Sequence, residues 1–306
     1  MTTNPRNETN DSSIVPTSRV PETVRRLGKP VRDALLYSSA YLALIAAAEV
    51  LIVTELLSLP LTPAPAVAAL LTFAVYGNDR VADVETDERT APARTAFVKR
   101  YHRLLYGLSA LAYGVAVALA VLGGPAAFAL ALVPGVVWVC YAQEWLPGHV
   151  KRLKQIFLLN SALVAGAWAL VVVCLPIAFV GAPITPAAVV VFLVFFLAIF
   201  VDVEIPNVRD RAGDREIGVK TLPVVYGVEG TRYALYSVTS LAAAILVAAF
   251  LDGIFGLVTV AGLSVSLLVL LGLVACLGRI GDTERLTIAA ECSRLPVLPL
   301  VVVPLL

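Results

Sequence analysis

The stretch "ITPAAVVVFLVFFLAIFVDVEIPNVRDRAGD", residues 184 to 214, joins a long apolar run directly to a polar segment rich in acids. Residues 184 to 201 carry no charged side chain, and a helix needs roughly 17 to 25 apolar residues to cross the hydrocarbon core of a membrane. Asn207, Asp210 and Asp214 follow at the spacing i, i+3, i+7, which places them near one face of a helix. The stretch therefore predicts a transmembrane helix that leaves the membrane carrying a series of oxygen-bearing side chains.

The whole chain has the composition of a membrane protein. Of its 306 residues, 59% are hydrophobic and 15% are charged, and the mean hydropathy is +0.88, which is too apolar for a soluble protein of this length. The apolar runs are rich in Ala, Val, Leu and Gly without alternating polar residues, so helices are favoured over barrel strands. We therefore predict an all-α polytopic membrane protein with nine transmembrane helices, at residues 37–58, 61–77, 104–122, 125–142, 156–180, 184–201, 233–251, 254–278 and 286–306.

The positions of the basic residues predict the orientation of the chain. All 23 Lys and Arg residues lie in the N-terminal tail, in the connections after the second, fourth, sixth and eighth runs, or at the edges of the neighbouring runs. Because basic connections face the cytoplasm, we expect a cytoplasmic, partly disordered tail at residues 1–35 and a transmembrane domain at residues 36–306. Nine crossings would place the C-terminus outside. The protein is thus expected to be a multi-pass protein of the cell membrane.

A first acidic series follows the second apolar run. Asp79, Asp83 and Asp87 have the spacing i, i+4, i+8, so they lie near one face if that helix continues. Asp83 and Asp210 are 127 residues apart, as are Asp87 and Asp214. The chain thus resembles two four-helix units followed by a ninth helix, with Asn207, Asp210 and Asp214 as the second acidic series. Because repeated membrane folds often form their site where the repeats meet, we expect both series to face a central cavity.

The two acidic series have the chemistry of a magnesium-diphosphate site. Oxygen ligands without His or thiolate partners suit hard cations, and Mg²⁺ prefers one or two carboxylates together with substrate phosphates. Either acidic series alone could instead be a charged connection exposed to water. The presence of two related series in corresponding places favours the metal site over this alternative. Basic side chains on the same predicted side of the membrane could bind the remaining phosphate oxygens; they are Arg94, Lys151, Arg152, Lys154 and Lys220.

On these residues the chain resembles the UbiA superfamily of intramembrane prenyltransferases, over roughly residues 25 to 300. The second acidic series, with Gly213 and the segment "GVKTLP" at residues 218 to 223, is similar to the family's second aspartate-rich motif almost throughout. The first series departs from the family pattern Asn-Asp-x-x-Asp-x-x-x-Asp, because Asp79 stands in the place of the Asn and Arg80 in that of the first Asp. The first metal could therefore receive fewer ligands.

The resemblance implies Mg²⁺-dependent transfer of a prenyl group from a polyprenyl diphosphate to a lipophilic acceptor in the membrane. Magnesium would neutralise the charge that grows on the leaving diphosphate, and an apolar bundle would shield the allylic cation from water. Expected partners are these two substrates and membrane lipids, and no nucleic acid. The expected catalytic residues are Asp83, Asp87, Asp210 and Asp214, and the expected metal ligands are these four together with Asp79 and Asn207.

Several alternatives remain open from the sequence. The acceptor is expected to be aromatic or a quinone precursor, but a glyceryl phosphate ether lipid or a carotenoid is also compatible with the motifs. A membrane transporter is the alternative from another class, although transporters place their ionisable residues near the bilayer midplane. Glu49, in the middle of the first run, is either a cavity residue that contacts the acceptor or a protonated acid bonded to a neighbouring helix.

Overall fold

The structure is a computed structural model that describes residues 22–82, 84, 88, 91–142 and 156–299. These residues form helices and no strands, so the predicted all-α class is confirmed for the described part of the chain. The first half contains α1 (Glu22–Tyr37), α2 (Ala40–Leu56), α3 (Ala64–Ala82), α4 (Pro92–Ala120) and α5 (Gly124–Ala142). The second half contains α6 (Leu159–Ala169), a π-helical turn (Leu170–Cys174), α7 (Leu175–Val180), α8 (Pro186–Glu216), α9 (Leu222–Leu251), α10 (Leu257–Cys276) and α11 (Thr283–Glu291).

The described helices are long and apolar enough to span a membrane several times. Five stretches qualify by length and composition, or up to six if α1 and α2, which bend by 67° against each other, form one span. The predicted number of nine is therefore not confirmed. Part of the difference arises because α4 and α5 are counted together as Pro92–Cys140, and because α11 has nine residues, too few to cross a bilayer.

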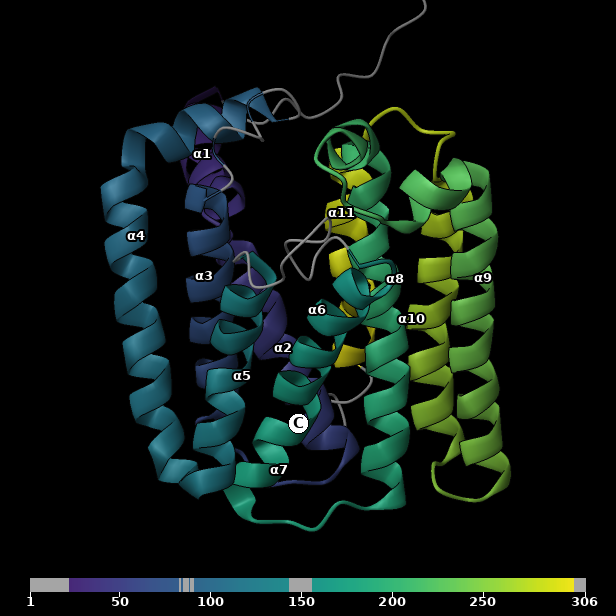
Figure 1. The fold of residues 1–306 in the computed structure, drawn as a ribbon. Helices are drawn as coiled ribbons and strands as arrows, with labels where there is room; N and C mark the ends of the chain where they lie inside the picture. Colours follow the sequence, from purple (N-terminus) through teal and green to yellow (C-terminus); the bar gives the residue numbers. More distant parts are fainter. Residues whose placement is uncertain (1–21, 83, 85–87, 89–90, 143–155, 300–306) are drawn as a thin grey trace, which may run out of the picture.

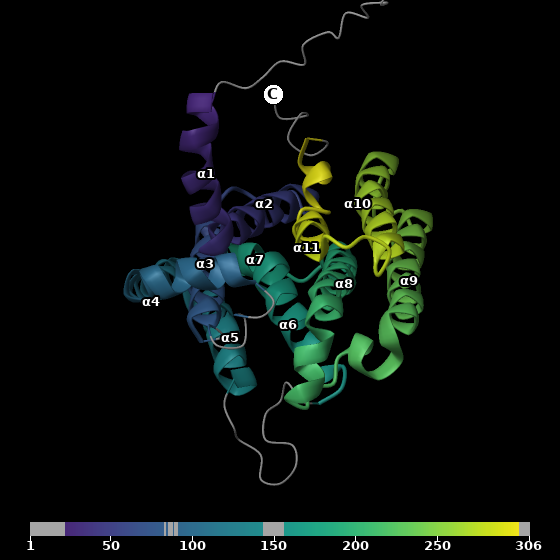
Figure 2. The ribbon, with the colours of Figure 1, turned by 90° about the horizontal axis from the view of Figure 1, so that it is seen from above.

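The helices form a bundle whose middle is surrounded by segments from both halves of the chain. Seen from above, α2, α3, α5, α6, α8 and α11 are arranged around α7, while α4 lies outside α3 and α9 and α10 lie outside α8 (Figure 2). The core is dominated by aliphatic and aromatic side chains such as Val50, Leu71 and Phe195. Large apolar side chains are exposed on α4, α9 and α10, as expected for helices that contact lipid. A central cavity is not confirmed.

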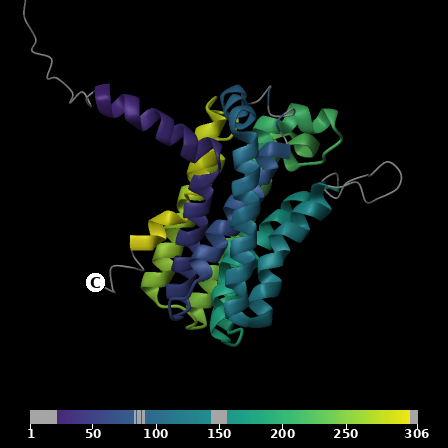
Figure 3. The ribbon, with the colours of Figure 1, turned by 90° about the vertical axis from the view of Figure 1, so that its left-hand side faces the viewer.

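The first helix leaves the bundle at an angle. α1 points away from the other helices (Figure 3), and Ser39, with φ 64°, separates it from α2. Tyr37 near its end packs against Phe97 of α4, with ring centroids 5.8 Å apart. The N-terminal tail predicted at residues 1–35 thus overlaps α1, while residues 1–21 lie outside the described part of the chain.

The apolar run at residues 184 to 201 continues into the second acidic series as one helix, α8. It starts where the Thr185 hydroxyl accepts a hydrogen bond from the backbone N–H of Ala188 at 3.2 Å, with Pro186 in the first turn, where a missing N–H costs nothing. α8 passes through Pro206 and ends at Glu216, before Gly218 with φ 75°. The predicted extension of this helix beyond the apolar run is correct.

Candidate functional site

The C-terminal ends of α3, which carries Asp79, and of α8, which carries the second acidic series, lie at the same end of the bundle, at the top of Figure 1. Glu291 of α11 lies within electrostatic range of Arg80 of α3 and of Arg209 of α8. Its Oε2 atom also accepts a hydrogen bond of 2.7 Å from the Tyr41 hydroxyl of α2. The residues next to Asp79 and Asp210 therefore share one neighbour.

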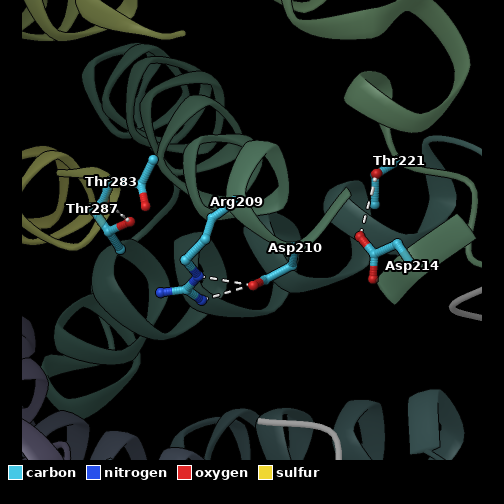
Figure 4. A network of polar contacts seen from close by, with 6 residues as sticks. All are labelled: Arg209, Asp210, Asp214, Thr221, Thr283 and Thr287. Carbon is cyan, nitrogen blue, oxygen red and sulfur yellow. Dashed lines mark hydrogen bonds and ion pairs between the residues drawn. The ribbon is translucent and has the colours of Figure 1, made fainter. Parts of the chain in front are cut away.

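Asp210 is held by a guanidinium group from its own helix. Arg209 Nε donates to Asp210 Oδ1 at 2.8 Å, and Arg209 Nη2 donates to Oδ2 at 2.7 Å, so both carboxylate oxygens accept a hydrogen bond (Figure 4). Arg209 extends along α8 on the side where Figure 4 shows Thr283 and Thr287 of α11. The Asp210 side chain is one third exposed, so it remains accessible to a ligand from outside the protein.

Asp214 lies one helical turn further on and contacts the start of α9. The Thr221 hydroxyl donates to Asp214 Oδ2 at 3.5 Å (Figure 4). The chain reaches this position because it reverses after α8, where the backbone N–H of Val219 donates to the Asp214 carbonyl oxygen at 2.8 Å. Lys220, a predicted diphosphate ligand, is exposed in the same turn.

Asn207 is oriented by a buried acid. Its amide nitrogen donates to Glu204 Oε2 at 3.2 Å, and the Ser161 hydroxyl of α6 donates to Glu204 Oε1. Glu204 has no exposed surface. From its spacing, Glu204 could be counted among the oxygen ligands on the same side of the helix, but the structure encloses it between α8 and α6.

The first acidic series is only partly within the described residues. α3 extends to Ala82, as the spacing required, and carries Asp79 near its end, where Trp138 Nε1 of α5 donates to Asp79 Oδ1 at 3.3 Å. Arg80 points toward α1 and α2, with Nε 3.4 Å from the Ser39 hydroxyl. Asp83 and Asp87 lie outside the described residues, so their role as metal ligands stays a prediction.

The predicted diphosphate-binding cations are also only partly described. Arg94 is the third residue of α4 and is buried, close to the connection that carries the first acidic series. Lys220 lies in the turn between α8 and α9. Lys151, Arg152 and Lys154 lie outside the described residues.

Glu49 belongs to a buried ion cluster. Arg294, which follows α11, donates from Nε to Glu49 Oε1 of α2 at 2.6 Å and from Nη1 to Asp202 Oδ2 of α8. All three residues are buried. The proposed alternatives for Glu49 were a contact with the acceptor or a bond from a neighbouring helix. The structure shows that Glu49 accepts a hydrogen bond from Arg294, which lies in the segment after α11. Sequence reasoning missed Arg294 because it counted this residue among the cations at the edges of the apolar runs, although Arg294 is the ninth residue of the predicted run 286–306.

The donor atoms of the described site fit a hard cation. Asp79, Asn207, Asp210 and Asp214 offer carboxylate and amide oxygens, which are the ligands that Mg²⁺ prefers. Within the described ranges, no group of three or more His, Cys, Asp or Glu side chains lies close enough to hold a metal by itself. A complete site therefore requires the predicted ligands Asp83 and Asp87, or oxygens of the substrate.

The fold and the site together define a multi-pass α-helical membrane protein in which the described acids of α3 and α8 lie at one end of the bundle. The chain belongs to the UbiA prenyltransferase family, whose model matches residues 34–286. Members of this family are prenyltransferases, so the protein is an enzyme of that class, and the transporter alternative is not supported. No curated protein matches the chain significantly.

Solved structures with the same fold come from this family. The apo structure of a UbiA homologue from Aeropyrum pernix K1 is 17% identical with a TM-score of 0.68, over 87% of this chain and 98% of that one. A UbiA homologue from Archaeoglobus fulgidus bound to DMAPP and Mg²⁺ is 13% identical with a TM-score of 0.57, over 89% of this chain and 99% of that one. A structure concerning digeranylgeranylglyceryl phosphate synthase is 16% identical with a TM-score of 0.57, over 90% and 98%.

Proposed function

We propose that this prenyltransferase is Mg²⁺-dependent and transfers the prenyl group of a polyprenyl diphosphate to a lipophilic acceptor within the membrane. The observation that carries the proposal is the second acidic series at the end of α8, with Asp210 accessible and Asp214 beside a lysine-bearing turn. Hard oxygen donors next to cations favour a metal-bound diphosphate over an organic anion alone. Asp79, at the end of α3, and the predicted ligands Asp83 and Asp87 complete the proposed site.

Each part of the site has a role in this proposal. Magnesium, when bound, supplies positive charge that stabilises the departing diphosphate. Six side chains would hold it, Asp79, Asp83, Asp87, Asn207, Asp210 and Asp214, and the cations of Arg94, Lys151, Arg152, Lys154 and Lys220 would bind the other phosphate oxygens. Arg209 donates to both carboxylate oxygens of Asp210, so a metal bound by Asp210 would compete with Arg209 for these oxygens.

The apolar bundle serves the second half of the reaction. Once the bond between the prenyl carbon and the diphosphate oxygen breaks, the allylic cation must meet the acceptor before it meets water. The apolar core, with residues such as Phe195 and Ile199 on α8, excludes water below the polar end of that helix. We propose that the bundle encloses a central cavity there and that its polar end faces the cytoplasm, with the C-terminus outside.

The acceptor is proposed to be an aromatic ring or a quinone precursor. The alternative of a glyceryl phosphate ether lipid is supported by the similarity to the structure concerning digeranylgeranylglyceryl phosphate synthase. That similarity is at 16% identity, which reflects the shared fold. A panel that contains both kinds of acceptor therefore belongs in the test, together with a carotenoid.

The proposal is tested with membranes that contain the protein, labelled geranylgeranyl diphosphate, Mg²⁺ and the acceptor panel. We expect transfer of label that is lost with EDTA, restored by Mg²⁺, and absent in Asp210→Ala. Asp252→Ala is the matched control, because Asp252 is an exposed acid at the other end of α9 and should leave transfer unchanged. Transfer that persists in EDTA and in Asp210→Ala would contradict the metal mechanism.

A further inference from the structure

We propose that Glu204 is a positioning residue, which turns the side-chain carbonyl oxygen of Asn207 toward the metal. This inference rests on the proposed function, since it assumes that Asn207 is a magnesium ligand. The inference gives a role to the buried side chain of Glu204, which does not take part in the proposed reaction. Glu204 has no exposed surface, and a carboxylate in such a place is costly unless several hydrogen bonds compensate it.

The hydrogen bonds of Glu204 come from three helices. The Ser161 hydroxyl of α6 donates to one carboxylate oxygen, and the Asn207 amide of α8 donates to the other at 3.2 Å. The backbone N–H of Leu222, the first residue of α9, is a further donor. Glu204 is therefore fixed from several directions and does not depend on a ligand for its orientation.

The chemistry of a carboxylate decides which way the Asn207 amide points. A side-chain amide has a donor end and an acceptor end, and an ionised carboxylate only accepts. Glu204 therefore selects the NH₂ group of Asn207 and leaves Asn207 Oδ1 directed elsewhere. Asn207 lies on the helix face of Asp210 and Asp214, so a fixed amide offers its carbonyl oxygen to the ion that these acids bind. Hydrogen-bond partners of metal ligands commonly tune metal affinity in this way.

Two competing explanations give different results. If Glu204 were itself a ligand, it would be reachable by the metal, but it has no exposed surface and both of its oxygens accept hydrogen bonds within the protein. If Glu204 only joined α6 to α8, its replacement would lower stability without changing metal affinity. A positioning role predicts a change in metal affinity that depends on the residue at position 207.

The first measurement is binding of Mn²⁺, as a spectroscopic probe for Mg²⁺, to the purified full chain with inorganic diphosphate, followed by electron paramagnetic resonance. In Glu204→Gln, the new amide can donate to Asn207 Oδ1 or accept from its NH₂ group, so the Asn207 amide is no longer held one way. We expect Mn²⁺ to bind about tenfold more weakly. Ser161→Ala is the control, because it removes a donor to Glu204 but leaves the bond to Asn207, and its binding should stay within about threefold of wild type.

The second measurement exchanges donor and acceptor between the two positions. Asn207→Asp alone places one carboxylate against another and should also weaken Mn²⁺ binding. In the double variant Glu204→Gln with Asn207→Asp, the amide introduced at position 204 can donate to the carboxylate introduced at position 207, whose second oxygen then faces the metal. Recovery to within about threefold of wild type would support positioning. A helix-joining role alone predicts no such recovery.

Two results separate this inference from the function on which it rests. If Glu204→Gln binds Mn²⁺ as wild type does, or if the double variant is weaker than both single variants, the positioning role is wrong, whatever the stability of the variants. If Asp210→Ala also binds Mn²⁺ like wild type, the second acidic series is not a metal site, and the proposed function fails together with the inference. Thermal unfolding of each variant in the same detergent establishes that it is folded.

Discussion

Arg209 and Asp210, adjacent residues on α8, form an ion pair in which the guanidinium donates to both carboxylate oxygens, at 2.8 and 2.7 Å. Adjacent helix positions point about 100° apart, so Arg209 has to fold back to make this contact. The pair neutralises Asp210, and its Arg209 partner is within the electrostatic range of Glu291 of α11. Asp210 is thus bound by an internal cation at the atoms that a metal would use.

Removal of this internal cation should strengthen metal binding. Arg209→Gln keeps a polar side chain but cannot neutralise Asp210, so the half-saturating Mg²⁺ concentration for transfer should fall about twofold to fivefold, the range for an ion pair of up to about 1 kcal/mol. Arg211→Gln is the control, because it removes the same charge from the residue on the other side of Asp210. We expect it to change the half-saturating Mg²⁺ concentration less than Arg209→Gln does. A higher Mg²⁺ requirement in Arg209→Gln would mean that Arg209 assists the metal or the diphosphate.

The Thr221 hydroxyl should contribute modestly to the metal site through Asp214. Thr221→Val keeps the shape of this buried side chain but removes the donor that lies 3.5 Å from Asp214 Oδ2. We expect the half-saturating Mg²⁺ concentration to rise about twofold to fivefold, the effect of losing one weak hydrogen bond of up to about 1 kcal/mol. Thr221→Ser retains the hydroxyl and should behave like wild type; equal defects in both variants would point to packing instead.

The ion cluster of Arg294 should stabilise the bundle. Arg294→Met leaves Glu49 and Asp202 buried without their cation, which typically costs about 3 to 5 kcal/mol. We therefore expect the thermal unfolding midpoint in detergent to fall by several degrees or more. Arg285→Met is the control, since Arg285 is highly exposed and pairs with Asp282.

A further variant separates charge from packing at this cluster. Glu49→Gln, Asp202→Asn and Arg294→Met together remove all three charges, so most of the lost stability should return. If Arg294→Met unfolds at the wild-type temperature, the cluster does not stabilise the bundle.

The spacing of residues along the chain predicted the helices that carry the candidate site. The contacts between residues far apart in the sequence could not be predicted in this way. The polar extension of α8 and the placement of Asp79 on α3 followed from helical spacing. The pairing of Arg294 with Glu49 joins residues 245 positions apart, and periodicity contains no information on such contacts. Glu204 has the spacing of a ligand, but its burial against Ser161 depends on how α6 packs on α8.

The number of membrane spans could also not be predicted from the pattern of apolar residues. Apolar runs mark segments that could enter a membrane, but they do not reveal the 67° bend between α1 and α2 or the short α11, which packs on α8. The likeness between the two acidic series was visible as a spacing of 127 residues. That Arg80 of α3 and Arg209 of α8 both lie within electrostatic range of Glu291 could be recognised only in three dimensions.

The most direct test of the central claim, that both acidic series hold one diphosphate, is the binding of labelled geranylgeranyl diphosphate at a fixed Mn²⁺ concentration to Asp83→Ala, Asp210→Ala and the double variant. If the two series form one site, each single change should remove most of the binding and the double variant should be no weaker than the weaker single variant. Losses that multiply in the double variant, or full binding in either single variant, would show that the two acidic series act separately.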